Sequence, residues 1–278
     1  MRISQAVKLW LEYHKLNSKK NTIRAYEGIL SKFCNEINGK NLNELTTEEV
    51  LAFLNEITEG RKPQTKRTRF SHLTAFFNFT KSNIDQDFQN PCDNPILRKM
   101  FKAKAVTSWD ILEKEVVDEI IFKTENPRNR LMLELMARGG MRVGEVLKLT
   151  PRDVNDRKLI LRDPKSGKEK EIVFIPQKVA DRLKDHIREK GIQPDQRIFP
   201  ICYEAARAMV KKAGEKIGIR LRPHDLRRHA ATYASRSGVP IEIVSKVILR
   251  HANLSTTQRY LGKVSDSEAM RWIENLYA

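Results

Sequence analysis

Long apolar runs are missing from this sequence: no stretch approaches the ~20 residues that a membrane-spanning helix needs. Cysteine is scarce, because Cys34, Cys92 and Cys202 are the only three, and they lie far apart. An odd number at such spacing is typical of reduced thiols and excludes a disulfide framework. Charges interrupt the amino-terminal stretch, which has no small-residue cleavage site, so we expect no signal peptide and a cytoplasmic location.

The usual motifs for cofactors are absent as well. The sequence has no G-x-x-x-x-G-K-[ST] loop for nucleotide phosphates, and neither a C-x-x-C nor an H-E-x-x-H pair for a metal. His224 and His229 are close in sequence, but on a helix their spacing turns them to different faces. The sequence therefore predicts a protein that uses neither ATP nor a metal ion, and no other cofactor.

Acidic residues are too few to balance the basic ones. The chain has 52 Lys and Arg against 35 Asp and Glu, a formal charge of +17 and a pI near 9.8. With 278 residues, 40% of them hydrophobic, it is long enough for two globular domains. Such an excess of positive charge predicts attraction to a polyanion, and double-stranded DNA is the partner we expect.

Apolar residues recur at helical spacing through the first part of the chain. They predict helices over 3–14 and 23–37, a third after a Thr46–Glu49 capping box, and a fourth that begins near Pro63. Basic residues crowd the start of this fourth helix, where a helix already attracts anions. They are either DNA backbone contacts or a solvated face: Lys62, Lys66, Arg67 and Arg69.

Residues 90–109 contain two prolines and then a basic run with little periodicity. We interpret residues 1–95 as an all-α, DNA-binding domain, 96–108 as a basic linker, and 109–278 as a second domain with a carboxy-terminal tail helix. Basic side chains of this region are also candidates for phosphate contacts: Arg98, Lys99, Lys102 and Lys104.

The second domain is expected to be mostly helical. The pattern predicts helices over 114–124, 130–138, 177–190 and 203–217, and a plausible tail helix from Val264 to Leu276. Two strands, 158–162 and 170–175, flank a D-P-K-S-G-K turn and predict a β-hairpin. The predicted fold class is therefore mainly α with a small β-hairpin or sheet, in two domains.

One stretch, 222–261, concentrates the residues that could perform chemistry. Pro223 suits the first position of a helix, and Gly238 suits the residue after its end. On that helix His224 and Arg227 are three apart and share a face, so together they could hydrogen-bond one phosphate. A single H-x-x-R pattern is more often a solvated face, so the rest of the chain must decide between the two.

Two further positions have open alternatives. Arg142 follows Gly139-Gly140 and precedes an apolar helix, so burial would require an anionic partner, either Glu145 or a phosphate. Lys165, near the hairpin tip, is either an ordinary surface lysine or a proton donor on a finger.

Taken in order, the motifs are G-G-M-R-V-G-E, P-K-S-G, H-D-L-R-R-H, L-R-H and S-T-T-Q-R-Y. This series strongly resembles the tyrosine recombinases, the phage integrase and Xer family. The resemblance covers the chain from about residue 109 to its end, and the first domain looks more loosely like the family's core-binding domain. It implies a site-specific recombinase that cuts and rejoins DNA through a covalent 3′-phosphotyrosine link.

The resemblance also implies a role for each matching residue. Tyr260 resembles the nucleophile, and Arg142 and Arg227 resemble the pair that holds the non-bridging phosphate oxygens. His224 is similar to the residue that manages the tyrosine proton, and His251 to a hydrogen-bond donor to the phosphate.

Two further roles follow from the same resemblance. Lys165 would protonate the departing 5′-oxygen, although Lys168 is close enough to compete for that role. Glu145 and Asp225 would orient their neighbours.

Two places depart from the family pattern. Arg250 stands where the family commonly has glycine before the histidine, which suggests a further phosphate contact. Arg138-Gly139-Gly140 replaces a frequent Thr-Gly pair before Arg142.

The resemblance implies a synaptic tetramer on two duplexes, with a tail that docks in its own subunit or in a neighbour, and recombinase or accessory partners. Two other functions stay open: a type IB topoisomerase that relaxes supercoils alone, and a DNA-binding protein without catalysis.

Overall fold

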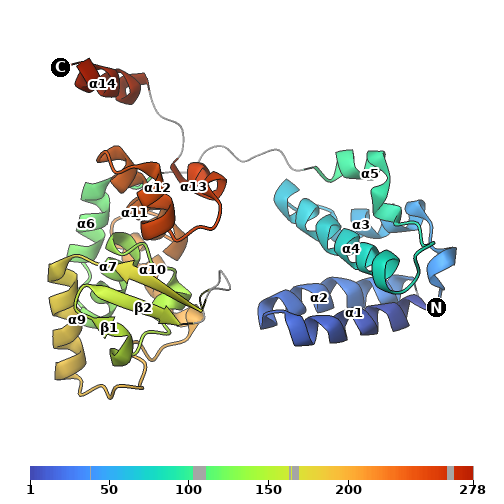
Figure 1. Ribbon diagram of the computed structural model, residues 1–278, viewed down its shortest axis with the longest axis horizontal. Coiled ribbons are helices and arrows are strands. Elements are labelled where there is room, and N and C mark those ends of the chain that lie inside the picture. The colour runs from blue at the N-terminus through green and yellow to red at the C-terminus, as the bar shows by residue number, and fades with distance from the viewer. Residues whose placement is uncertain (38, 103–110, 163, 165–168, 262–265, 278) are drawn as a thin grey trace. The chain divides into compact units, whose positions relative to one another are not determined.

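The protein is described by a computed structural model, which covers residues 1–37, 39–102, 111–162, 164, 169–261 and 266–277. The chain forms two compact units, Met1–Val106 and Thr107–Ala278. The described residues are mostly helical, with one small sheet (Figure 1). The predicted fold class is therefore confirmed.

The first unit is a helical bundle around an aromatic core. Its buried side chains include Trp10, Phe33, Phe76 and Phe77, and rings from different helices meet edge to face. Figure 1 shows α1 and α2 side by side with α4 across them. The elements are α1 (Ile3–Asn17), α2 (Lys20–Glu36), η1 (Leu42–Glu44), α3 (Thr47–Thr58), α4 (Pro63–Asn83), η2 (Pro91–Asp93) and α5 (Pro95–Met100).

Local signals set the helix boundaries in this unit. Thr46 is the N-cap of α3: its hydroxyl accepts from the Glu49 N–H at 3.3 Å, and the Glu49 carboxylate accepts from the Thr46 N–H at 3.2 Å. Pro63 occupies the first position of α4, as expected.

The first unit extends beyond residue 95, where the sequence placed its end. Residues 95–100 form α5, with Leu97 and Phe101 buried in the same core. The Phe101 ring stacks on Phe70 of α4, with ring centroids 5.3 Å apart. The prolines that suggested a linker instead start a short 3₁₀ turn and a helix, because proline is preorganised for a first helical position.

The second unit packs most of its helices around one apolar core. Figure 1 shows α11 inside this unit, and it contacts α6, α7, η4 and α13. The helical elements are α6 (Lys114–Phe122), α7 (Pro127–Arg138), α8 (Val143–Val146), η3 (Pro151–Asp153), α9 (Gln177–Glu189), α10 (Tyr203–Glu215), α11 (Pro223–Arg236), α12 (Ile241–Ile243), the π-helical turn η4 (Val244–Ile248), α13 (Leu254–Leu261) and α14 (Asp266–Tyr277).

A three-stranded antiparallel sheet completes the unit, in the order β1 (Val154–Asn155), β2 (Lys158–Arg162), β3 (Lys170–Phe174). The hairpin strands confirm the prediction, and β1 was not predicted because two residues give no periodicity. In β3 the inward positions are Glu171 and Val173, while Ile172 and Phe174 face out. A carboxylate thus occupies a core-facing position and two large apolar side chains do not.

The turn between α7 and α8 packs tightly against η4. Gly140 has φ 59°, and a Cβ there would lie 2.9 Å from the carbonyl oxygen of Ile248. Only glycine fits this combination of backbone conformation and close approach. The Gly139-Gly140 pair therefore brings the segment before Arg142 against the segment before His251.

Within the part of the chain that the structure describes, no helix combines the length and apolar character required to span a membrane.

Candidate functional site

Helix α11 presents the first two site residues. Pro223 is its first residue, and the Asp225 carboxylate accepts from the Arg222 N–H at 2.9 Å, which fixes the helix start. Asp225 also pairs with Arg228 at 3.2 Å. His224 is exposed, whereas Arg227 is fully buried, with 0% exposed surface.

The guanidinium of Arg227 connects two loops that are distant in sequence. Its terminal nitrogens donate to the carbonyl oxygens of Gly140 and Leu249. These carbonyls lie just before Arg142 and just before His251. Arg227 therefore connects the Arg142 and His251 segments, and its guanidinium has no exposed surface in the structure without DNA.

Arg142 is the N-cap residue of α8 and pairs with the third residue of that helix. Its guanidinium donates to Glu145 Oε1 at 2.5 Å, and its backbone N–H donates to Glu145 Oε2 at 2.8 Å. Of the two partners expected for Arg142, Glu145 is the one that the structure contains. The Arg142 side chain is 24% exposed, so part of it stays open to a ligand.

Arg250 is not placed as the sequence suggested. Only 3% of its side chain is exposed, and its guanidinium contacts Glu145 at 2.8 Å and Glu171 at 3.5 Å. It also donates to the carbonyl oxygens of Ile248 and Gly140. The structure therefore corrects the expected phosphate contact at Arg250. The guanidinium points inward, because two buried carboxylates attract it.

The electrostatics show that these side chains share one location. Burial, together with the positive charges of Arg227, Arg142 and Arg250, lowers the pKa of His251 to about 4. Desolvation lowers the pKa of His224, and nearby arginines, among them Arg227, act in the same direction. Burial by itself would raise the pKa of Glu145, but Arg250 and Arg142 outweigh it and lower that pKa. Both histidines are therefore neutral near pH 7.

Helix α13 is anchored to His251 through one threonine. The fully buried Thr257 hydroxyl lies 2.9 Å from His251 Nδ1 and 2.8 Å from Ser245 Oγ, and the His251 N–H donates to the Ser245 carbonyl at 2.9 Å. Thr257 precedes Tyr260 by about one helical turn. Tyr260 belongs to α13, so this threonine connects the His251 loop to the helix of the expected nucleophile.

The structure thus brings together Arg142, His224, Arg227 and His251 and places the helix of Tyr260 beside them. Lys165, its competitor Lys168 and Lys104 lie outside the described residues. The candidate DNA contacts of the first unit are exposed or half-buried on their own unit: Lys62, Lys66, Arg67, Arg69, Arg98, Lys99 and Lys102. Arg98 pairs with Asp93 at 2.5 Å.

Sequence reasoning missed the supporting roles of Ser245, Thr257 and Glu171, and the buried role of Arg250. Thr257 could have been found from its spacing, because residues three apart on a helix share a face. Glu171 could not, because it stands between apolar residues in a strand whose inward face the sequence leaves ambiguous.

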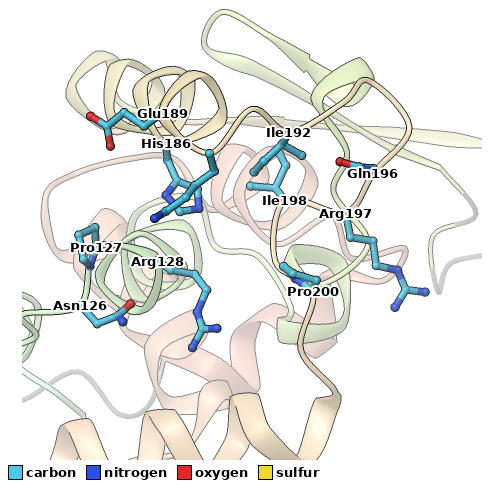
Figure 2. A pocket seen from close by; sticks show the side chains of 11 residues that line it. Asn126, Pro127, Arg128, His186, Glu189, Ile192, Gln196, Arg197, Ile198 and Pro200 are labelled. Carbon is cyan, nitrogen blue, oxygen red and sulfur yellow. The ribbon is translucent and has the colours of Figure 1, made fainter.

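A separate pocket of about 770 Å³ lies elsewhere in the second unit. Figure 2 shows Arg128, His186 and Arg197 among the side chains around it, together with the apolar Ile192 and Ile198. None of the predicted site residues lines this pocket. Over the described ranges, no three His, Cys, Asp or Glu side chains gather closely enough to hold a metal ion.

The half-buried, neutral His251 predicts an acid-sensitive fold. Because its pKa is about 4 in the folded chain and 6.5 is the reference value, the unfolded chain binds more protons between these values. Stability should therefore fall as the pH is lowered through this window. Between pH 6.5 and about 4, the melting temperature of His251→Gln, measured by circular dichroism, should fall less than that of the wild type. Equal losses would contradict the placement of His251.

Comparison with known families agrees with this arrangement. Residues 110–266 match the model of the phage integrase family, and residues 7–83 match that of the phage integrase N-terminal SAM-like domain. The chain is 31% identical to tyrosine recombinase XerA of Pyrococcus horikoshii over 262 residues, which covers 89% of this chain and 85% of the relative. It is 29% identical to a tyrosine recombinase of Pseudothermotoga lettingae over 271 residues, 92% of each chain.

Solved structures share the fold. The Tn1549 transposon integrase in complex with transposon right end DNA matches with a TM-score of 0.76 at 16% identity, over 100% of both chains. A lambda integrase dimer bound to a COC′ core site matches with a TM-score of 0.72 at 18% identity, over 94% of this chain and 77% of that one.

Proposed function

This chain belongs to the phage integrase family and is a tyrosine recombinase, and we propose that it recombines DNA at specific sites through a covalent intermediate on Tyr260. The Tyr260 phenolic oxygen attacks a backbone phosphorus, forms a 3′-phosphotyrosyl bond and breaks the bond to the 5′-oxygen of the next nucleotide. Rejoining is the reverse reaction with a 5′-hydroxyl from the partner strand. One phosphodiester is exchanged for another, so the proposal includes neither metal nor ATP.

One observation supports this proposal above the others: Arg142, His224, Arg227 and His251 come from three separate stretches and converge beside the helix of Tyr260. A phenol with a pKa of about 10 attacks a phosphodiester slowly without help. Two guanidinium groups stabilise the negative charge that develops on the phosphate oxygens. Arg142 is already partly exposed, and Arg227 joins it once DNA binding displaces a carbonyl partner.

The histidines complete the proton transfers and hydrogen bonds. His224 is neutral and exposed, so it can accept the Tyr260 proton as the phosphotyrosyl bond forms. His251 is neutral, and its Nδ1 bonds the Thr257 hydroxyl, which itself donates to Ser245 Oγ. In this proposal the two hydroxyls rotate when DNA binds, so that Thr257 donates to Nδ1 and the ring proton on Nε2 is donated to the phosphate. Lys165 supplies the proton that the departing 5′-oxygen takes up.

A duplex with a nick close to the cleavage point tests the proposal. After cleavage the short 5′-hydroxyl fragment diffuses away, so the covalent adduct cannot be resealed and accumulates. We expect the wild-type protein to form a 3′-linked adduct that migrates above free protein on a denaturing gel, also with a chelator present. DNA binding without an adduct would support a DNA-binding protein without catalysis. Efficient supercoil relaxation at high dilution would support a type IB topoisomerase.

We further propose that the protein assembles as a tetramer on two duplexes, with recombinase or accessory partners left open. Tail helix α14 exposes Met270, Ile273 and Tyr277. Trp272 of the same helix packs close to Gly238 of its own chain: a Cβ at that glycine would lie 3.1 Å from the indole ring. The exposed apolar side chains of α14 are suited to a neighbouring subunit.

The start of helix α4 supplies part of the DNA affinity in this proposal. Lys62 and Arg67 are both exposed there, next to the unpaired N–H groups of the helix end. We expect Lys62→Ala with Arg67→Ala to weaken binding uniformly across sequences and to reduce the slope of log K against log salt by about one per lost phosphate contact. Fluorescence anisotropy at several salt concentrations measures both quantities.

Lys81 provides the matched control, because it is exposed in the last turn of the same helix. Lys81→Ala removes one positive charge from the same helix but not from its start. An equal change in slope per charge for Lys81→Ala would mean that net charge, and not the start of α4, sets the affinity.

A further inference from the structure

Arg250 adopts a backbone conformation that favours glycine. Its φ is 52°, in the left-handed region, and it lies in the short loop between η4 and α13. Non-glycine residues pay a free-energy cost there. An arginine at such a position needs compensating contacts, and the structure supplies them.

The side chain of Arg250 is almost completely buried among acceptors. One terminal nitrogen donates to Glu145 Oε2 at 2.8 Å and to the Gly140 carbonyl at 3.3 Å, and the other donates to the Ile248 carbonyl at 2.7 Å. Its Nε faces Glu171 Oε2 at 3.5 Å. Only 3% of the side chain is exposed, and its nitrogens are directed at these protein acceptors and not at solvent.

These acceptors belong to three different parts of the site. Glu145 holds the guanidinium of Arg142, Glu171 lies on β3 of the hairpin, and Ile248 ends η4 just before the His251 loop. Glu171 faces the core, and neither of its oxygens accepts a hydrogen bond within the described ranges. Arg250 is therefore the cation that this buried carboxylate faces.

We propose that Arg250 is a positioning residue of the cleavage reaction: by holding Glu145, Glu171 and the Ile248 carbonyl at once, it fixes Arg142 and His251 relative to the hairpin. Its effect on cleavage rests on the proposed function, whereas its effect on the site geometry does not. Arg250 never touches the DNA, and acts through the residues that do.

The simpler explanation is that Arg250 only neutralises Glu171. A buried carboxylate without a cation is strongly destabilising, so any loss of Arg250 would then act through stability. The two explanations separate when the charge of Glu171 is removed as well, because Glu171→Gln abolishes the need for neutralisation but not the need to hold Glu145.

The first experiment measures melting temperature, DNA affinity and single-turnover adduct formation on the nicked duplex. Arg250→Gly should bind DNA normally, melt at a lower temperature and form adduct more slowly by about tenfold to a hundredfold, as when other outer supporting residues are lost. Arg250→Gly with Glu171→Gln should regain melting temperature but not rate. Arg250→Lys keeps the positive charge but not the planar guanidinium with its several donors. Its melting temperature and cleavage rate should lie between those of the wild type and of Arg250→Gly.

Arg182→Met is the matched control. Arg182 pairs with the buried Glu134 at 2.6 Å on the α7–α9 side of the same unit, so its loss leaves this buried carboxylate with the more distant Arg138, at 4.0 Å. It should lower the melting temperature and leave the cleavage rate unchanged at a temperature where the protein is folded. Recovery of the rate together with stability in the double variant, or a normal rate in Arg250→Gly, would overturn the proposal.

A second experiment is independent of catalysis. Histidine ring resonances followed by NMR without DNA give the pKa of His251, which is about 4 and which Arg250 helps to lower. Arg227 and His224 of α11 and Arg142 before α8 also face this ring. Arg250→Gly should raise the His251 pKa, and Arg182→Met should not. An unchanged pKa would overturn the inference even if the wild type recombines DNA, and a raised pKa would support it even if no adduct forms.

Discussion

Tyr260→Phe should bind its DNA with unchanged affinity and form no covalent adduct on the nicked duplex. The substitution removes one oxygen, and phenylalanine has no nucleophile with which to attack phosphorus. Tyr260 belongs to α13, which Thr257 anchors to His251 and Ser245, so the helix should stay in place. Adduct yield on a denaturing gel and affinity by anisotropy are measured on the same preparation.

Tyr233 offers the matched control for this change. It is an exposed tyrosine of α11 whose ring stacks with His229, away from the Arg227 contacts. Tyr233→Phe removes the same hydroxyl from the same unit and should leave the adduct yield intact. An adduct that survives in Tyr260→Phe would mean that another residue is the nucleophile.

Arg227→Lys should have the second largest effect. The guanidinium reaches the carbonyl oxygens of Gly140 and Leu249 at once, and a single ammonium cannot reproduce that fork. One buried carbonyl is left without its donor, which costs about 1–3 kcal/mol of folding free energy. Cleavage should fall by about a hundredfold to a thousandfold, since a donor to the developing charge is lost as well.

Stability and cleavage must be separated in this variant. Arg182→Lys is the control, because it makes the same change at an arginine that pairs with buried Glu134 outside the candidate site. It should lower the melting temperature without changing the cleavage rate of folded protein. A cleavage rate close to that of the wild type in Arg227→Lys would contradict the role of Arg227 at the phosphate.

Local signals in the sequence were sufficient for much of the fold. The Thr46–Glu49 capping box, Pro63 and Pro223 at helix starts, and Gly238 with φ 88° after α11 all appear where the pattern predicted them. These features depend on neighbours within one helical turn, so the sequence contains the complete information. The motif order likewise identified the family.

Long-range packing was not predictable in the same way. The K-E-I-V-F strand gives no sign that Glu171 faces inward and Ile172 outward, because the choice depends on Arg250, which is far along the chain. Arg250 in turn was interpreted as a surface contact, since a sequence does not reveal that two carboxylates lie beneath it. The burial of Arg227 by backbone carbonyls was hidden for the same reason.

The most direct measurement identifies the residue that becomes attached to DNA. Protein trapped on the nicked duplex is digested with nuclease and protease, and the modified peptide is sequenced by mass spectrometry. The proposed reaction predicts a single nucleotide joined through its 3′-phosphate to Tyr260. A nucleotide on any other side chain, or one joined through its 5′-phosphate, would contradict it.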